Sequence, residues 1–391
     1  MIEDIASFNF NTTPRIIYGE NVAKDASPFS KLMGDRILLI TDKGLTTLGL
    51  YGDFLKNLEK NNVKVTVFDD VEADPSLKTL EKAISFGKDI ACTGVVGFGG
   101  GSSMDVAKLT ALVLGSAEDL ENAWGVANAK GPRLPLCLIP TTAGTGSEVT
   151  PVSIITVDGD EKRGVSSPII LPDFAVLDPA LTLGLPAATT AATGIDAMVH
   201  AIEAYASKNK NNNPMSGILA KEALVLLGGS IRTAVSDPKN LQARGKMLLG
   251  SMLAGMAFAN SPVAAVHALA YPLGGSFHIT HGLSNALVLP AVLRFNAVDA
   301  WAAKKYAELF PFLFPFEQMG NNNQTNASLF IENLTVLSKE LGLPQKLREV
   351  SIPEDACASM AKDAMKQTRL LINNPREVSE QDAYDIYHSI W

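Results

Sequence analysis

The first part of the chain alternates short apolar runs with amphipathic segments. Residues 36–42 (RILLITD) form an apolar run that ends in an acid, and residues 63–70 (VKVTVFDD) alternate in polarity and are rich in valine. Both patterns are typical of β-strands. Between them, residues 50–62 place Leu55 and Leu58 at a helical spacing on one face. This strand–helix–strand order predicts one unit of an α/β fold.

The same alternation continues through the next ninety residues. Residues 76–89 form an amphipathic segment that Ser76 can cap, which predicts a helix. Residues 92–103 predict a buried strand that runs into a glycine-rich loop, residues 104–114 predict a helix, and residues 135–142 predict another apolar strand. A repeated strand–helix order of this kind favours a mostly parallel sheet with helices on both faces.

The pattern changes near Pro186, where strand signals almost vanish. The following segments are rich in alanine and have helical character: 187–207, 216–235, 241–260 and 263–275. Polar segments at 208–216 and 320–328 predict surface connections. We therefore predict an α/β domain over residues 1–185 and an all-α domain over residues 186–391.

Composition narrows the class of partner and the compartment. The 391 residues are 47% hydrophobic and 19% charged, which is enough apolar material for two cores. A net charge of −8 without a basic block argues against nucleic acid or an anionic membrane as a partner. The three cysteines form no CxxC pair, so free thiols in a reducing compartment are expected. The N-terminal segment lacks the pattern of a signal peptide, and the apolar windows are too short to cross a bilayer. We expect a cytoplasmic protein.

A glycine turn joins one predicted strand to the next predicted helix. Gly99, Gly100 and Gly101 allow a pyrophosphate to approach the backbone, and Ser102 adds a hydroxyl at the positive end of the helix dipole. The turn matches neither the GxGxxG fingerprint nor the P-loop, and such turns are also used for purely structural reasons.

Two further segments support a nucleotide site. Asp42 ends a predicted strand, where a carboxylate can accept a hydrogen bond from a ribose hydroxyl and would repel a 2′-phosphate, so NAD is favoured over NADP. The alternative is that Asp42 caps the following turn. Residues 140–150 (PTTAGTGSEVT) follow an apolar strand and offer hydroxyls and small residues to a phosphate, ribose or nicotinamide. Glu148 in this segment is equally compatible with a structural role.

One acid and three of the five histidines suggest a metal site. Asp196 and His200 are four residues apart in a predicted helix, which places them on one face about 5–6 Å apart. His267 lies in a second apolar helix, and His281 follows after a short linker. Each has a plain alternative, since His267 suits a hydrogen-bonded core position and Asp196–His200 suits a simple side-chain hydrogen bond. The four together favour a site for Fe(II), Zn(II), Mn(II) or Ni(II).

Taken together, these segments resemble the iron-containing (group III) alcohol dehydrogenase family. The matching segments are Asp42, GGGSSMDVAK, PTTAGTGSEVT, EKRG with Lys162, ATGIDAMVHAIEAY, and VHALAYPLGG followed by HGLSNA. They occur in the family's order over nearly the whole chain. The resemblance implies a dehydroquinate synthase-like architecture that forms a homodimer or higher homo-oligomer. It also implies hydride transfer between NAD(H) and a small alcohol, aldehyde or ketone, with Fe(II), Zn(II) or another divalent cation bound.

The resemblance also implies residue roles. Metal ligands carry over to Asp196, His200, His267 and His281. Cofactor contacts carry over to the following positions: Asp42, Gly99, Gly100, Gly101, Ser102, Asp105, Thr141, Thr142, Thr145 and Lys162.

One position departs from the family. Members often carry a histidine four residues after the first histidine of the VHxxxH helix, and it is regarded as a proton relay or as a neighbour of the nicotinamide. Here that position is Tyr271. Its phenol, with an unperturbed pKa of about 10, is a poorer base at neutral pH. His278, three residues before His281, is an alternative relay or a solvent-facing loop residue. Hydroxyacid–oxoacid transhydrogenases also differ in this segment and are an alternative function.

Three other functions are compatible with parts of the pattern. A dehydroquinate synthase-like lyase would also combine NAD with a metal, but it needs a basic cluster for its phosphorylated substrate, whereas the metal-flanking helices are apolar. A non-catalytic protein that binds NAD and a metal would show no turnover. A metal-free reductase of the maleylacetate type would not need the complete ligand set.

Overall fold

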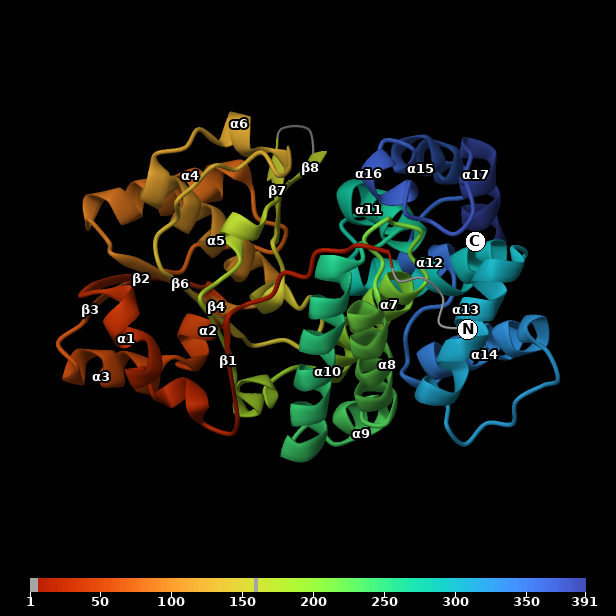
Figure 1. Ribbon diagram of the computed structural model, residues 1–391, viewed down its shortest axis with the longest axis horizontal. Coiled ribbons are helices and arrows are strands. Elements are labelled where there is room, and N and C mark those ends of the chain that lie inside the picture. The colour runs from red at the N-terminus through yellow and green to blue at the C-terminus, as the bar shows by residue number, and fades with distance from the viewer. Residues whose placement is uncertain (1–5, 158–160) are drawn as a thin grey trace. The chain divides into compact units, whose positions relative to one another are not determined.

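The computed structural model describes residues 6–157 and 161–391 (Figure 1). Its internal contacts divide the chain into two compact units. The α/β unit spans Asn11–Gly184. The helical unit comprises Leu185–Trp391 together with the described residues that precede Asn11.

A six-stranded sheet forms the centre of the α/β unit. Its order is β1 (Arg15–Tyr18), β9 (Phe174–Leu177), β6 (Leu136–Pro140), β4 (Gly94–Gly99), β2 (Arg36–Ile40) and β3 (Lys64–Phe68). Every pair of neighbouring strands is parallel. The predicted parallel sheet is therefore confirmed. Because these strands are parallel, β4 and β6 both end at the same edge of the sheet, and the loops that follow them start there.

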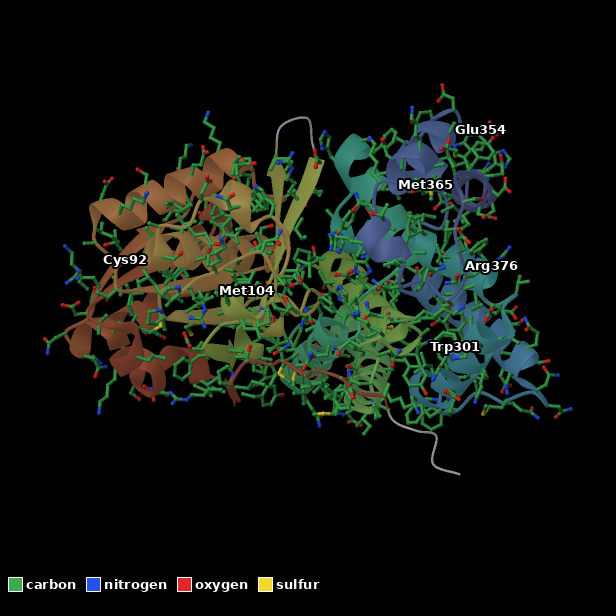
Figure 2. All side chains as sticks on the ribbon, turned by 45° about the horizontal axis from the view of Figure 1, so that its top comes forward. Cys92, Met104, Trp301, Glu354, Met365 and Arg376 are labelled. Carbon is green, nitrogen blue, oxygen red and sulfur yellow. The ribbon has the colours of Figure 1, made fainter. Side chains whose placement is uncertain are left out.

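The inner strands β2, β4, β6 and β9 are apolar on both faces because both faces are covered, whereas the edge strands β1 and β3 are partly exposed. In β2, Ile37 and Leu39 belong to one hydrophobic core, and Leu38 and Ile40 belong to the other. The helices that supply the two layers are α1 (Ser27–Met33), α2 (Lys43–Leu48), α3 (Gly52–Lys60), α4 (Leu77–Asp89), α5 (Gly101–Ser116) and α6 (Leu120–Ala123). Figure 2 labels Met104, a fully buried residue of α5. Successive side chains of a strand point to opposite faces of the sheet. A strand that is covered on both faces therefore needs an unbroken run of apolar residues.

A second, small sheet was not expected from the sequence. It has the order β5 (Gly125–Val126), β8 (Glu161–Ser166) and β7 (Val152–Val157). Strands β7 and β8 pair antiparallel, whereas β5 and β8 pair parallel. The segment therefore adds an antiparallel pair to a unit whose main sheet is parallel.

Residues 185–391, all of which are described, contain helices and no strand. The α-helices are α7 (Ala187–Tyr205), α8 (Pro214–Gly228), α9 (Ile231–Ser236), α10 (Leu241–Asn260), α11 (Ala265–Phe277), α12 (His281–Asn296), α13 (Ala300–Leu313), α14 (Asn323–Glu340), α15 (Ala356–Ala364), α16 (Thr368–Leu371) and α17 (Glu380–Ser389). The predicted change from an α/β to a helical pattern is confirmed.

Two details of the helical unit differ from the sequence expectation. The helical stretch over 216–235 is two helices, because α8 ends at Gly228 and α9 begins only at Ile231, after Gly229 and Ser230. The predicted loop at 320–328 is helical from Asn323 onward, since Asn322 caps α14 by accepting a hydrogen bond from the backbone N–H of Thr325. Asparagine is a strong N-cap, so a polar run of this kind can start a helix as well as form a loop. None of the helices in the described residues is by itself long and apolar enough to cross a membrane; α10 and α11 pass that test only as a pair, bent by 108°.

Candidate metal centre and nucleotide-binding loops

Three helices of the helical unit bring one carboxylate and three imidazoles together. Asp196 and His200 lie one turn apart on α7, His267 lies on α11, and His281 is the first residue of α12. One potential ligand atom from each residue lies within 4.8 Å of those of the other three. Asp196, His200 and His267 are buried, whereas 39% of the His281 side chain is exposed. The four residues proposed as ligands are therefore neighbours, with an accessible side at His281.

The rings and the carboxylate pack closely. The His200 ring stacks on the His267 ring with centroids 4.7 Å apart, and the His267 and His281 centroids are 5.4 Å apart. His281 Nε2 lies 3.7 Å from Asp196 Oδ1. Burial by itself raises the pKa of Asp196, but the three nearby imidazoles and a hydrogen bond from Asn285 outweigh burial, so this pKa lies below its usual value. An ionised carboxylate is therefore favoured at the centre of the cluster.

Glu203 orients one of the imidazoles. It lies on α7 two turns after Asp196 and is buried. Its Oε2 is 2.6 Å from His267 Nδ1, and its Oε1 accepts a 2.7 Å hydrogen bond from the Val266 backbone N–H. A carboxylate at Nδ1 holds the proton there and leaves the lone pair on Nε2 for a metal. Glu203 thus fixes both the tautomer and the orientation of His267.

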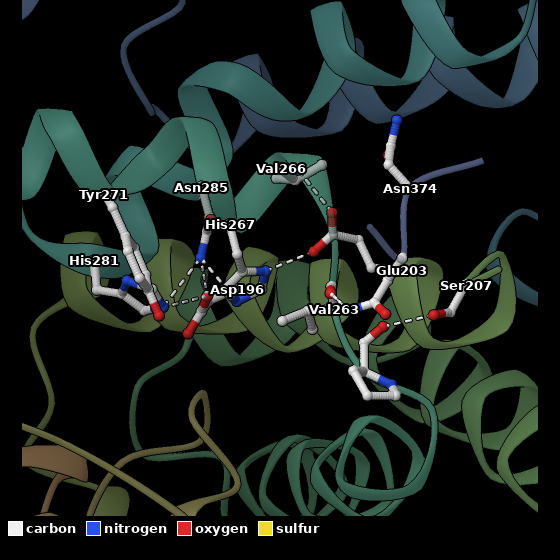
Figure 3. Close-up of polar contacts among 12 residues, drawn as sticks. Asp196, Glu203, Ser207, Val263, Val266, His267, Tyr271, His281, Asn285 and Asn374 are labelled. Carbon is white, nitrogen blue, oxygen red and sulfur yellow. Dashed lines mark hydrogen bonds and ion pairs between the residues drawn. The ribbon is translucent and has the colours of Figure 1, made fainter. Parts of the chain in front are cut away.

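Asn285 reaches into the cluster from α12 (Figure 3). Its amide nitrogen donates a 2.6 Å hydrogen bond to Asp196 Oδ1. The same nitrogen is 3.2 Å from His281 Nε2 and 3.4 Å from His267 Nε2. Asn285 therefore ties the carboxylate of α7 to the start of α12.

The backbone of α12 approaches α7 closely because residue 282 is glycine. A Cβ on Gly282 would lie 2.6 Å from the carbonyl oxygen and 2.9 Å from the carbonyl carbon of Ala192. Backbone atoms cannot give way as the end of a flexible side chain can. The absence of a side chain at Gly282 is what allows the neighbouring His281 to reach Asp196.

The donor set fits a divalent transition-metal ion. Ligand atoms about 2.1 Å from one ion lie at most about 4.2 Å from one another, so donors within 4.8 Å need only a small movement to share an ion. Three imidazole nitrogens and one carboxylate oxygen suit iron or zinc, and they do not suit magnesium or calcium, which prefer oxygen ligands.

The two predicted relay residues differ in their surroundings. Tyr271 lies one turn after His267 on α11, half-buried, with its ring centroid 6.2 Å from that of His281. Its hydroxyl accepts a 3.3 Å hydrogen bond from Arg369 Nη2. His278 is exposed and ends α11 in a left-handed conformation, with φ of 56°. Of these two residues, Tyr271 is the one for which the structure gives a ring contact with a candidate ligand.

The glycine turn of the α/β unit leads from β4 directly into α5. Gly99 has a φ of 155°, and a Cβ there would lie 2.7 Å from Ser103 Oγ. A Cβ on Gly101 would lie 2.9 Å from Thr145 Cγ2. The turn therefore has no room for side chains. The first N–H groups of α5, a helix of 16 residues, have no partner within the helix and lie next to the turn.

The loop after β6 lies against this turn. The Thr141 N–H donates a 2.9 Å hydrogen bond to the Gly99 carbonyl oxygen, and the Thr142 side chain lies next to Gly100. Thr145 faces Gly101. The structure therefore brings together the two segments that the sequence proposed separately as nucleotide-binding loops.

A buried lysine anchors the second loop. Lys108 on α5 is fully buried, and its Nζ donates to Ser147 Oγ at 2.7 Å, to Thr150 Oγ1 at 3.2 Å and to the Val152 carbonyl oxygen at 2.6 Å. Asp105, one turn earlier, lies 3.6 Å from Nζ. Burial lowers the pKa of Lys108 to about 8, although the nearby carboxylates oppose this shift. The lysine fastens the loop to the helix that starts at the glycine turn.

The two acids of this region differ in their contacts. Asp105 accepts a 2.7 Å hydrogen bond from Ser147 Oγ and a 2.9 Å bond from the Ile154 N–H, so each carboxylate oxygen has a partner in the chain. Glu148 is buried, and burial raises its pKa to about 7. Within the described residues, Glu148 Oε1 accepts no hydrogen bond. The contacts of Asp105 are therefore those of a structural acid, whereas Glu148 has no equivalent side-chain contact in the part of the chain that the structure describes.

Asp42 and Lys162 also have partners within the α/β unit. Asp42 caps α2, because its Oδ1 accepts a 3.0 Å hydrogen bond from the Leu45 N–H. Capping occupies one oxygen and is compatible with a second acceptor role for the other. Lys162 on β8 forms a 2.8 Å ion pair with Asp74 and donates to Thr156. The nucleotide roles of both residues stay predictions.

Comparison with known sequences now decides the family. The family profile described as iron-containing alcohol dehydrogenase matches residues 13–179, and the profile described as the C-terminal part of the Fe-containing alcohol dehydrogenase family matches residues 190–391. The chain belongs to the iron-containing alcohol dehydrogenase family. The long-chain-alcohol dehydrogenase 1 of Geobacillus thermodenitrificans strain NG80-2 is 41% identical to it over 92% of this chain and 90% of that protein.

Solved structures of this iron-containing alcohol dehydrogenase family have the same fold. A 1,3-propanediol oxidoreductase aligns with a TM-score of 0.93 at 34% identity, covering 98% of this chain and all of that one. A sulfoacetaldehyde reductase from Bifidobacterium kashiwanohense, solved in complex with NAD⁺, aligns with a TM-score of 0.84 at 27% identity, covering 98% of each chain. The likeness of this chain to these two oxidoreductases therefore extends over 98% of its length.

Sequence reasoning missed four residues that shape these sites in this member of the family: Glu203, Asn285, Lys108 and Arg369. Glu203 and Asn285 had a signal, because each stands at a helical spacing of three or four residues from a proposed ligand. Lys108 stands in the GGGSSMDVAK motif, but a lysine in an apolar helix gives no indication of its partners. Arg369 lies in no motif.

Proposed function

We propose that this protein is a metal-dependent, NAD-linked oxidoreductase that transfers a hydride between NAD(H) and a small alcohol, aldehyde or ketone. The observation that carries the proposal is the buried set of Asp196, His200, His267 and His281, whose ligand atoms converge within 4.8 Å. The family description and the printed activities of the relatives, an alcohol dehydrogenase and a propanediol oxidoreductase, support the reaction class.

Iron and NAD are the proposed cofactors. The family description names iron, and the nitrogen-rich donor set fits it, with zinc or another divalent cation as an alternative. NAD is supported by the NAD⁺ complex of the sulfoacetaldehyde reductase and by Asp42, whose negative charge disfavours a 2′-phosphate. We assign the pyrophosphate to the backbone of Gly99, Gly100 and Gly101 at the start of α5, with Ser102, Thr141, Thr142 and Thr145 beside it.

The residues of the candidate metal centre have three different roles in this proposal: metal binding, orientation of a ligand and proton transfer. A bound divalent ion supplies Lewis acidity to an alcohol or carbonyl oxygen. Asp196, His200, His267 and His281 hold it, and Glu203 keeps the Nε2 lone pair of His267 aimed at it. The accessible side at His281 admits the substrate. Tyr271, which stands beside His281, is the proposed proton carrier, with exposed His278 as the second candidate.

Within the α/β unit, Asp105, Lys108 and Lys162 have positioning roles in this proposal. Asp105 and Lys108 hold the loop after β6 against α5, so the cofactor would meet a prearranged surface. Lys162 is engaged by Asp74 and reaches a nucleotide only by leaving that partner.

Domain limits, assembly and compartment complete the proposal. We infer a dinucleotide-binding domain over residues 1–185 and a metal-binding domain over residues 186–391. We also infer a cytoplasmic homodimer or larger homo-oligomer. The three cysteines are free thiols, which suits a reducing compartment.

Metal removal tests the proposed function. Stripping the protein with a chelator should abolish NAD reduction by an alcohol, and adding Fe(II) under anaerobic conditions should restore it. Asp196→Ala should bind Fe(II) at least about 1000-fold more weakly, because it removes the anionic ligand. Elemental analysis and calorimetry measure this independently of turnover. Full activity of a metal-free preparation would refute the proposal.

A further inference from the structure

Tyr271 lies next to His281, on the accessible side of the candidate metal cluster, and Arg369 is hydrogen-bonded to Tyr271. Tyr271 on α11 has its ring 6.2 Å from the His281 ring, at an interplanar angle of 51°. Arg369 on the short helix α16 donates a 3.3 Å hydrogen bond from Nη2 to the Tyr271 hydroxyl. Figure 3 shows Tyr271 extending from α11 down to the level of His281. Tyr271 therefore connects Arg369 to His281, the partly exposed candidate ligand.

The charge of Arg369 is not used within the protein. In residues 6–157 and 161–391, its guanidinium makes the hydrogen bond to Tyr271 and no ion pair. The nearby Lys366, by contrast, pairs with Asp363 at 2.7 Å. Arg232 on α9 likewise pairs with Glu340 at 2.7 Å. Arg369 is exposed, so a solute can reach it.

A solvated surface arginine would also be exposed, but solvation alone does not account for the hydrogen bond from Arg369 to Tyr271. Among the described residues, Arg369 binds the side chain of Tyr271, which neighbours His281, and His281 is the candidate ligand that is not buried. A guanidinium offers five N–H donors in a planar fork that matches a carboxylate. One donor meets the phenol, and no acceptor in the described residues engages the others, so they can bind an anion.

We propose that Arg369, steadied by Tyr271, recognises an anionic group at the far end of the substrate. The substrate class would be short alcohols and aldehydes that carry a carboxylate a few carbons from the reacting carbon. The hydroxyl or carbonyl end lies at the metal centre, and the carboxylate end accepts hydrogen bonds from Arg369. This inference rests on the proposed function and adds its substrate class.

The test compares two four-carbon alcohols that differ in the charge of one end. The metal-loaded protein and NAD are assayed with 4-hydroxybutyrate and with 1-butanol. We expect a higher kcat/KM for 4-hydroxybutyrate. Arg369→Gln should lower kcat/KM for 4-hydroxybutyrate by about 10–100-fold, mostly through KM, because a charge-assisted hydrogen bond is lost. Because Arg369 also contacts Tyr271, the value for 1-butanol measures any effect that passes through the phenol, and it should fall much less than the value for 4-hydroxybutyrate. Arg369→Lys should recover part of the difference between the two alcohols.

Two measurements keep the outcomes apart. Arg232→Gln, which removes a surface arginine from the same unit, should leave both substrates unaffected. Calorimetry of 4-hydroxybutyrate binding to the metal-loaded protein should show about tenfold weaker binding for Arg369→Gln. Equal binding by the wild type and Arg369→Gln overturns this inference, whatever the turnover. Absence of turnover with both alcohols, while binding still depends on Arg369, overturns the proposed function and leaves the anion site standing.

Discussion

The metal cluster and the glycine turn show two ways to build a binding site. The cluster is made of side chains from three helices, and its geometry depends on how α7, α11 and α12 pack. The glycine turn is made of backbone, and its geometry depends on side chains that are missing. The first site should therefore be sensitive to any change that moves a helix, and the second to any atom added at the turn.

Both sites nonetheless depend on supporting groups that a ligand would not touch. Glu203 holds His267 in the helical unit, and Lys108 holds the loop around Ser147 in the α/β unit. The supports differ in kind. Glu203 fixes one imidazole and its tautomer, whereas Lys108 fixes a whole loop through three oxygen acceptors. Loss of either should weaken one site and spare the other.

Among changes at residues that would not touch the ion, Gly282→Ala should have the largest effect. The added methyl would lie 2.6 Å from a backbone oxygen of α7, so α12 must shift and carry His281 away from Asp196. A displacement of about 1 Å costs on the order of 100-fold in activity. We expect a loss of that size together with weaker Fe(II) binding by calorimetry. Gly217→Ala on α8, where the new methyl meets only ordinary contacts, is the matched control. Unchanged metal affinity in Gly282→Ala would show that the close helix contact does not position the ligand.

Glu203→Gln should act on the same site with a smaller effect. The amide cannot accept from both Val266 and His267, and an N–H turned toward Nδ1 favours the tautomer that places a proton on Nε2. We expect about 10–100-fold weaker Fe(II) binding, with activity largely recovered at saturating metal. Circular dichroism should show an unchanged fold, and Glu222→Gln on the exposed face of α8 should behave as wild type. Equal metal affinity in the two variants would remove Glu203 from the metal centre.

Gly101→Ala probes the backbone site. Its methyl would lie 2.9 Å from Thr145 and would push the loop after β6 away from α5. We expect the KM for NAD to rise about tenfold while metal content stays normal. Gly52→Ala at the start of α3, where the added atom meets open space, is the control. If the metal content fell and NAD binding did not, the assignment of the two sites to the two units would be wrong.

Glu148→Gln should have the smallest effect on activity, and it acts instead on the pH dependence of stability. Burial raises its pKa in the folded protein from 4.5 to about 7. Between these values the folded state holds a proton that the unfolded state has released, so this group lowers the free energy of unfolding as pH rises from about 4.5 to about 7. Glu148→Gln removes this term. We expect the variant to match wild type near pH 4.5 and to be more stable than it by about 3 kcal/mol above pH 7, as measured by denaturant unfolding. A difference that does not change with pH would contradict the buried carboxylate.

Some of the fold and of the sites could be predicted because they depend on short-range patterns. Parallel strands buried on both faces need continuous apolar runs such as RILLI, and an i,i+4 pair such as Asp196 and His200 lies on one face of any helix. The small sheet β5–β8–β7 escaped prediction because its strands are short and partly polar, and their pairing is set by neighbours. The start of α14 escaped it because an asparagine-rich run is compatible with both a cap and a loop.

The sequence by itself determined the candidate residues: the glycines between a strand and a helix, and four side chains able to bind a cation. Only the tertiary structure decided which groups support them. Glu203 is an unremarkable acid on an alanine-rich helix until α11 brings His267 to it, Lys108 is an apolar-helix lysine until the loop after β6 folds over it, and Arg369 becomes part of a site only when α16 packs beside α11. The physical reason is that residue type and helical spacing are local properties, whereas a hydrogen bond between residues 64 or 98 positions apart exists only after the chain has packed.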